Sequence, residues 1–189
     1  MNVATLLQLY KAGKRDFSNV DLSGFNLAGV KLSRINLIRA NLAHTVLKGS
    51  DLSGGFFIWA NLSKADLSGA ILIATDFSAA NLQGANLAYS KLNEAVLTGS
   101  WLQKANLNHA DLQGAIVAGA NLVEANLRKA DLRGTNFYGA NLSKADLSEA
   151  NMAHANLRGA NLTGAIMPRQ VTRAEKIKGD VPKIEVFKY

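Results

Sequence analysis

The sequence predicts an all-β solenoid, and three observations on residues 15–169 lead to that fold class. Large apolar residues recur at every fifth position from Phe17 to Met167; of these 31 central positions, 24 are Leu, four Phe, two Met and one Val. Alanine fills 19 of the 31 positions two residues earlier, and Asp or Asn fills 22 of the 31 positions immediately before the central residue. Glycine stands two residues after the central residue 13 times, and no insertion disturbs the register.

The repeating unit is therefore A-(D/N)-L-x-x. Its residues occupy, in order, the alanine, Asx, central, fourth and glycine positions. On an α-helix, a step of five residues advances about 500°, so successive leucines would point to every side. On a flat strand, an odd step places alternate leucines on opposite faces. The pattern is consistent only if the chain turns a corner in each unit and every central residue faces one axis, with coils stacked as in a solenoid.

The tandem A(D/N)LXX motif resembles the pentapeptide-repeat family over residues 15–169 or so. The resemblance implies a right-handed quadrilateral β-helix with four units per coil, which for 31 units gives about seven to eight coils. It also implies that the central and alanine positions face inward and that the other three positions face outward. The opening "LLQLYKAGKRDFSNVDL" resembles the start of cyanobacterial members.

Three segments follow from the register. Residues 1–14 are expected to form an N-terminal capping helix with Leu6, Leu7, Leu9 and Tyr10 on an apolar side, stopped by Gly13. Residues 15–168 form the β-helix. Residues 169–189 are expected to form a basic C-terminal cap or tail with Ile184, Val186 and Phe187; whether it covers the last coil or an apolar side of the rod stays open.

The composition limits the environment and the partners. The chain has no cysteine, so disulfides and Cys-based zinc sites are excluded. We expect no signal peptide and no transmembrane segment, and a cytoplasmic location. The net charge of +7 is concentrated at the ends: residues 1–15 and 168–189 each carry +3, and the stretch between them has 12 basic and 11 acidic residues.

No constellation of residues predicts catalysis, so we expect no enzyme, no catalytic residues, no cofactor, no metal ion and no small-molecule substrate. His44, His109 and His154 fall on three different sides of the solenoid and cannot share a metal ion. The carboxylates sit mostly in the Asx position, where side-chain ladders are the expected use. Lys104, Glu124 and Lys144 predict a surface ion-pair column. The basic spot of Arg128, Lys129 and Arg133 lacks interleaved aromatic residues, so we expect no nucleic-acid partner.

The stretch "GGFFIWA", residues 54 to 60, has four large apolar residues in a row, whereas the units around it carry mostly small and polar residues. The register places Phe57 inside, in a core ladder of Phe17, Phe57, Phe77 and Phe137, and places Phe56, Ile58 and Trp59 outside. Residues 20 apart share a column, and one side of the rod gathers more outward apolar groups than any other. We expect a protein interface there. This candidate interface consists of Ile38, Phe56, Ile58, Trp59, Val96, Trp101, Ile116 and Tyr138.

The leading hypothesis is a non-enzymatic scaffold that binds a protein partner, or a second copy of itself, through this apolar face. Two other interpretations of the patch remain open: the C-terminal tail covers it, or it has no partner. The family resemblance adds a functional alternative, a DNA mimic that inhibits or protects DNA gyrase. That role needs a strongly acidic rod, whereas this rod is nearly neutral and its ends are basic.

Overall fold

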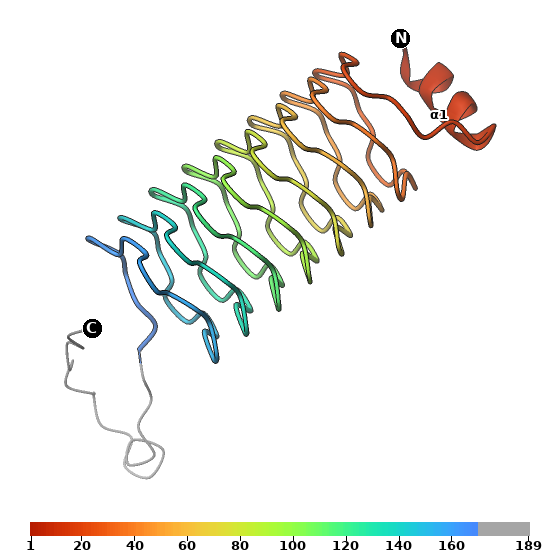
Figure 1. The fold of residues 1–189 in the computed structure, drawn as a ribbon. Helices are drawn as coiled ribbons and strands as arrows, with labels where there is room; N and C mark the ends of the chain where they lie inside the picture. The colour runs from red at the N-terminus through yellow and green to blue at the C-terminus, as the bar shows by residue number, and fades with distance from the viewer. Residues whose placement is uncertain (170–189) are drawn as a thin grey trace.

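The computed structural model of the chain describes residues 1–169, which form a rod of stacked coils with one helix, α1 (Val3–Lys11), at its N-terminal end (Figure 1). The sides of the rod are isolated parallel β-bridges rather than long strands. The bridges run from Asp16↔Asn36 to Asp146↔Ile166, and each joins residues 20 apart in the sequence. Every bridging residue occupies the Asx position, so four five-residue units separate neighbours in a column.

Backbone hydrogen bonds explain why five residues make one side of the coil. The N–H groups of the central and glycine positions donate to the next coil, as Phe17 does to the carbonyl of Asn36 at 2.8 Å and Asn19 to that of Ile38 at 2.9 Å. The corner is closed within the chain, as Phe25 N–H donates to the carbonyl of Leu22 at 3.1 Å. This four-residue turn has its third residue, the glycine position, at positive φ. Type II turns have this geometry.

The glycine position is left-handed along the whole rod. Every residue in it from Asn19 to Gly164 has a φ between 53° and 71°, whether or not it is glycine. Left-handed backbone is disfavoured by about 1 kcal/mol or more for a residue with a Cβ atom, and glycine avoids that cost. The frequency of glycine at this position therefore follows from the corner geometry.

The core is the shared interior of the coils, as the register predicts. Central and alanine positions in the middle of the rod are buried; Leu107 and Ala105 are both 0% exposed. Where the alanine position carries a hydroxyl, that group bonds to a backbone carbonyl: Thr45 Oγ1 donates to the carbonyl of Leu22 at 3.1 Å and Ser50 Oγ to that of Leu47 at 2.7 Å. These polar replacements remain satisfied inside the core.

Helix α1 covers the first coil. Asn2 caps it, since its side-chain oxygen accepts a hydrogen bond from Thr5 N–H at 2.8 Å, and Gly13 ends the segment with a φ of 98°. Leu6 is fully buried against the rod, and Tyr10 packs on the same core. The expectation that Leu7 and Leu9 share the apolar side is wrong: both are exposed, because the helix packs on the rod through Val3, Leu6 and Tyr10.

The opposite end of the described chain is less covered. The apolar side chains of the last coil are only partly buried, namely Met152, Leu157, Leu162 and Met167. The expected C-terminal cap or tail, with Ile184, Val186 and Phe187, lies outside the described residues apart from Arg169.

Candidate functional site

The outward surface of the rod is built by a short-range hydrogen bond that repeats in most units. The side-chain oxygen of the Asx position accepts a hydrogen bond from the N–H of the fourth position, as Asp16 Oδ1 does from Ser18 at 2.9 Å. This Asx turn fixes the side chain and prepares the left-handed residue that follows. Asp and Asn therefore have a local structural role in the repeat.

Asn side chains also connect coils. Asn86 Nδ2 donates to Asp66 Oδ1 at 3.1 Å, Asn106 Nδ2 to Asn86 Oδ1 at 3.1 Å and Asn126 Nδ2 to Asn106 Oδ1 at 3.4 Å. We call this column of Asp66, Asn86, Asn106 and Asn126 the Asn ladder. It matches the role expected for the Asx position from the sequence.

The candidate interface interrupts such polar columns. Five of its eight residues are exposed: Phe56 by 46%, Trp59 by 63%, Trp101 by 54%, Ile116 by 42% and Tyr138 by 54%. The remaining three are partly buried, namely Ile38, Ile58 and Val96. All eight side chains thus reach the surface, at the three outward positions of the repeat.

The structure brings only part of this set together. Phe56, Asp76, Val96 and Ile116 follow one another in one bridged column, which we call the apolar column although it contains Asp76. Trp101 belongs to a different column, between Asn81 and Asn121. Ile38 and Ile58 lie on successive coils. The N–H group of Arg39, the residue after Ile38, donates to the Ile58 carbonyl at 2.9 Å.

Tyr138 lies apart from the rest. It occupies the fourth position, as Ile58 does, but Ser78, Thr98 and Ala118 separate the two along the rod. The dense part of the candidate interface is therefore the surface around Phe56, Ile58 and Trp59, continued by Val96 and Ile116.

The phenylalanines beneath this side are core residues but not one continuous stack. Phe17, Phe57, Phe77 and Phe137 are all at most 2% exposed. Only Phe57 and Phe77 stack on each other, with ring centroids 5.0 Å apart and an angle of 29° between the rings. Leu37, Leu97 and Val117 occupy the intervening places in the same column.

Gly55 makes room for this stack. A Cβ atom at Gly55 would lie 2.9 Å from Cε2 of Phe57 and 2.9 Å from the carbonyl oxygen of Leu52. This role of Gly55 was not predicted from the sequence. The available signal was a glycine at an alanine position, two residues before a Phe at the central position.

Four ion pairs join charged residues of the rod between Lys104 and Glu149. Lys104 Nζ lies 3.7 Å from Glu124 Oε2, which is one step of the expected ion-pair column. Glu149 pairs with both Arg128 and Lys129, and Arg133 pairs with Asp131. The Arg128 hydrogen bond and charge hold the pKa of Glu149 below its ordinary value, and the Arg133 hydrogen bond does the same for the pKa of Asp131. The basic spot is therefore largely neutralised.

One aromatic pair beside that spot was missed. Tyr89 and His109 stack with centroids 4.9 Å apart and lie in the same glycine-position column as Lys129 and Glu149. Their spacing of 20 residues was the signal that pointed to this stack.

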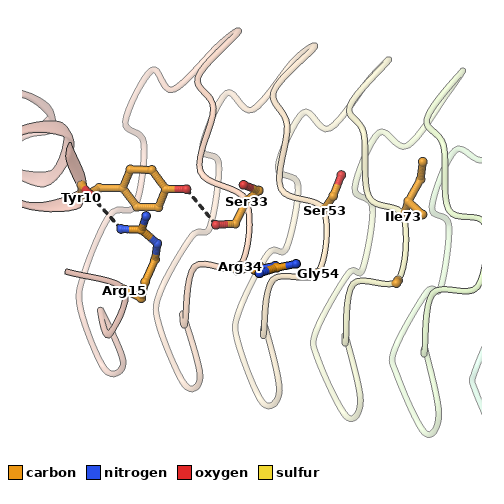
Figure 2. Close-up of a pocket in the computed structure, with 8 residues that line it drawn as sticks. Tyr10, Arg15, Ser33, Arg34, Ser53, Gly54 and Ile73 are labelled. Carbon is orange, nitrogen blue, oxygen red and sulfur yellow. Dashed lines mark hydrogen bonds between the residues drawn. The ribbon is translucent and has the colours of Figure 1, made fainter. Parts of the chain in front are cut away.

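An open pocket lies where α1 meets the rod (Figure 2). Tyr10 Oη donates to the Ser33 carbonyl at 2.8 Å, and Arg15 donates to the Tyr10 carbonyl at 2.8 Å while its guanidinium stacks 4.0 Å from the Tyr10 ring centroid. Arg34 lies beside Gly54. The polar groups here dock the helix onto the rod.

Within residues 1–169, no group of three His, Asp or Glu side chains has the arrangement needed to hold a metal ion. His44, His109 and His154 are all exposed. No helix among these residues is long and apolar enough to cross a membrane.

Comparison with protein families gives one match. The family described as pentapeptide repeats matches in eight copies, over residues 16–54, 60–99, 90–128, 105–143 and 130–167. Comparison with curated proteins gives no match.

Several solved structures are similar. HetL, a pentapeptide repeat protein involved in heterocyst differentiation regulation from the cyanobacterium Nostoc sp. strain PCC 7120, is 33% identical over 89% of this chain and 93% of its own, with a TM-score of 0.48. Rfr23, a pentapeptide repeat protein from the cyanobacterium Cyanothece 51142, is 24% identical over 86% of this chain and 99% of its own, with a TM-score of 0.26. QnrB1, a plasmid-mediated fluoroquinolone resistance protein, is 18% identical over 80% and 89%, with a TM-score of 0.44.

Proposed function

Because the chain belongs to the pentapeptide repeat family, we propose that it is a non-enzymatic scaffold that binds another protein, or a second copy of itself, through the candidate interface. Membership of the family implies a right-handed, four-sided β-helix. We infer about seven to eight coils from the 31 units of the sequence. Such a rod displays side chains in regular columns, which suits a binding surface.

The observation that carries the proposal is the exposure of large apolar side chains where the repeat favours polar or small ones. Phe56 and Trp101 occupy Asx positions, and Trp59 occupies a glycine position. Phe56 and Trp101 lack the side-chain oxygen of the Asx turn, and Trp59 accepts a left-handed backbone with a φ of 60°. None of the three gains burial in return. Large aromatic residues with this exposure are typical of protein interfaces.

The use of the polar groups supports a scaffold over an enzyme. Asx-position oxygens accept backbone N–H groups, as in the bond from Ser18 to Asp16, and several carboxylates of the rod pair with neighbouring bases. Catalytic groups, in contrast, converge on a cleft that shields the substrate from water. The pocket beside α1 is open, and its polar contacts are internal to the chain.

No specific observation favours the DNA-mimic alternative. A gyrase-directed mimic of DNA needs a continuous acidic surface, whereas residues 16–167 carry 12 basic and 11 acidic side chains. QnrB1 is 18% identical to the chain, so the likeness concerns the fold. Inhibition of gyrase supercoiling at low micromolar protein would contradict this charge argument.

The repeat itself supplies variants that test the proposal without disturbing the fold. Phe56→Asn, Trp59→Gly and Trp101→Asn each introduce a residue that the repeat prefers at that position. We expect normal circular dichroism and thermal stability but loss of a dimer in sedimentation equilibrium, or loss of a co-purified protein. Trp59→Glu and Val96→Glu should act in the same way, because a desolvated charge would face the partner.

Tyr89→Gly is the matched control. Tyr89 is 64% exposed and occupies a glycine position like Trp59, but it lies on a different side of the rod. Its removal should leave mass and partner recovery unchanged. If the three interface variants also leave both unchanged, the proposed interface is wrong.

A further inference from the structure

A single carboxylate lies within the dense part of the candidate interface. Asp76 is bridged to Phe56 on one side and to Val96 on the other. The backbone fixes this order, since Phe57 N–H donates to the Asp76 carbonyl at 2.7 Å and Phe77 N–H donates to the Val96 carbonyl at 2.7 Å. Asp76 is partly buried, as are Ile58 and Val96 beside it. Its carboxylate is thus held in a fixed place between apolar side chains.

The neighbours of Asp76 leave its carboxylate short of donors. Its Oδ1 atom accepts a hydrogen bond from Ser78 N–H at 2.8 Å. Asp21 and Asp66 accept a similar bond and, in addition, one from an Asn of the next coil: Asn41 Nδ2 to Asp21 at 3.1 Å and Asn86 Nδ2 to Asp66 at 3.1 Å. The corresponding neighbour of Asp76 is Val96, which has no side-chain donor.

No cation of the described chain compensates for the missing hydrogen-bond donors at Asp76. The ion pairs within residues 1–169 involve Asp131, Glu124 and Glu149, and none places a Lys, Arg or His within 4.0 Å of the Asp76 carboxylate. In the free protein, water solvates the remaining lone pairs. A partner that covers Phe56, Val96 and Ile116 removes that water, and an uncompensated carboxylate in an apolar contact is strongly unfavourable.

We propose that the partner is a different protein whose contact surface presents an arginine or lysine side chain, set among apolar side chains, to Asp76. This inference rests on the proposed function, because it requires that the candidate interface is covered. Arginine fits well, since its guanidinium donates two parallel hydrogen bonds to a carboxylate and its stem adds apolar contact.

A second copy of the chain fits this surface less well. A two-fold dimer joins the same patch of both copies. Such a contact, centred on the apolar column, brings the two Asp76 carboxylates toward one another without a cation between them. Like charges in a desolvated contact oppose association. We therefore assign the occupant as a partner with opposite charge.

The test uses a library of random dodecapeptides displayed on phage and selected on the immobilised full-length chain. The strongest binder is then synthesised, and its Kd is measured by fluorescence anisotropy. We expect an Arg or Lys flanked by apolar residues in the selected peptides. Asp76→Asn should weaken binding about 30-fold or more, the effect expected when one partner of a desolvated charge pair is removed.

Two matched controls accompany this variant. Asp76→Asn keeps an oxygen for Ser78 N–H, as Asn36 does for Ile38 N–H at 3.0 Å, so the Asx turn is preserved. Asp111→Asn makes the same change on another side of the rod, where Asp111 accepts from Gln113 N–H at 3.1 Å, and should leave Kd unchanged. A peptide with citrulline or norleucine in place of its Arg or Lys tests the pair with the protein unaltered. It should bind wild type as weakly as the parent peptide binds Asp76→Asn.

The outcomes separate the two proposals. If Phe56→Asn abolishes binding but Asp76→Asn and the neutral peptide change Kd less than about threefold, the interface stands and the assignment of a cationic partner is wrong. If none of these changes has an effect, or no peptide is enriched, both proposals are wrong. A dimer that Phe56→Asn dissociates and Asp76→Asn strengthens would identify a second copy as the occupant and overturn this inference.

Discussion

The Asn ladder and the apolar column occupy the same position of the repeat on two sides of one rod, yet they differ in what their side chains bond to. In the Asn ladder, Asp66, Asn86, Asn106 and Asn126 are linked by side-chain hydrogen bonds from coil to coil. In the apolar column, Phe56, Val96 and Ile116 have no side-chain donors. Both columns nevertheless have the same unbroken series of backbone bridges.

This difference shows that the backbone and the buried core suffice to stack the coils. The side-chain ladder adds stability but is not required, because the bridges continue past Phe56 and Val96. The residues at the outward positions can therefore vary while the coils stay stacked. A column without side-chain hydrogen bonds between coils exposes apolar side chains to a partner. Five predictions, in order of decreasing effect, test this separation of core and surface.

Insertion of one alanine after Gly114 should have the largest effect. It shifts every later unit by one residue, so the central residues beyond it leave the axis and both columns lose their pairing at once. Gly114→Ala is the control; it meets only Glu94 Cγ at 3.9 Å and costs about 1 kcal/mol for its φ of 70°. Thermal unfolding should show a far greater loss for the insertion. Equal stability of the two variants would contradict the stacked-coil arrangement.

Phe57→Ala and Phe56→Ala should separate core from surface at adjacent residues. Phe57 is 0% exposed and stacked on Phe77, so its truncation leaves a cavity and should cost about 3–5 kcal/mol. Phe56 is 46% exposed, and its truncation should change the free energy of unfolding by less than about 0.5 kcal/mol. Urea unfolding of both variants measures the difference. A similar loss in both would mean that Phe56 also supports the fold.

The inward and outward assignment of these residues could be predicted from the sequence because it depends only on the five-residue register. The same register places Trp59 outside and Phe77 inside, and the burial agrees. The family likewise could be predicted from the motif, and the pentapeptide repeat match confirms it.

Contacts between specific side chains could not be predicted in this way. That only two of the four phenylalanines stack depends on Leu37 and Leu97 lying between the others, and on the ring orientations. The exposure of Leu7 and Leu9 depends on how α1 docks through Tyr10 and Ser33, which no local pattern encodes. The shortage of hydrogen-bond donors at Asp76, in contrast, follows from Phe56 and Val96, the neighbours 20 residues away that the register identifies.

Gly55→Ala should destabilise the protein although alanine is the most frequent residue at this position. The added Cβ atom would lie 2.9 Å from both Phe57 Cε2 and the Leu52 carbonyl oxygen, so the ring or the backbone must move. Overpacking of this kind costs about 1–3 kcal/mol. Thermal unfolding checks the loss. The double variant Gly55→Ala, Phe57→Leu should recover much of it, and failure to do so would place the clash elsewhere.

Asn106→Ala should cost more than Val96→Ala, although both change an Asx position, on opposite sides of the rod. Asn106 donates to Asn86 Oδ1, and its own Oδ1 accepts from Asn126 Nδ2 and Asn108 N–H. Loss of these partly exposed bonds should lower the free energy of unfolding by about 1–2 kcal/mol. Val96→Ala should cost under about 1 kcal/mol, since Val96 is only partly buried. A reversed order in urea unfolding would show that the ladder contributes nothing.

The smallest effect concerns Asp146, two coils beyond Asn106 in the column of the Asn ladder. Hydrogen bonds from Ser148, its side chain first and then its backbone, together with the charge of Arg128, lower the pKa of Asp146 below its ordinary value of 3.8. The unfolded chain therefore binds this proton at a higher pH than the folded one. The stabilisation is present above about pH 4 and is lost as the pH falls through the lowered folded pKa.

Because Asp146 Oδ1 accepts from Ser148 N–H at 2.9 Å, Asp146→Asn keeps that bond while it removes the titration. Between about pH 5 and pH 2, the free energy of unfolding measured in urea should fall less steeply for this variant than for wild type, by under about 1 kcal/mol for a group so close to solvent. Parallel curves for the two proteins would mean that the end of the column stabilises the rod equally well without the charge.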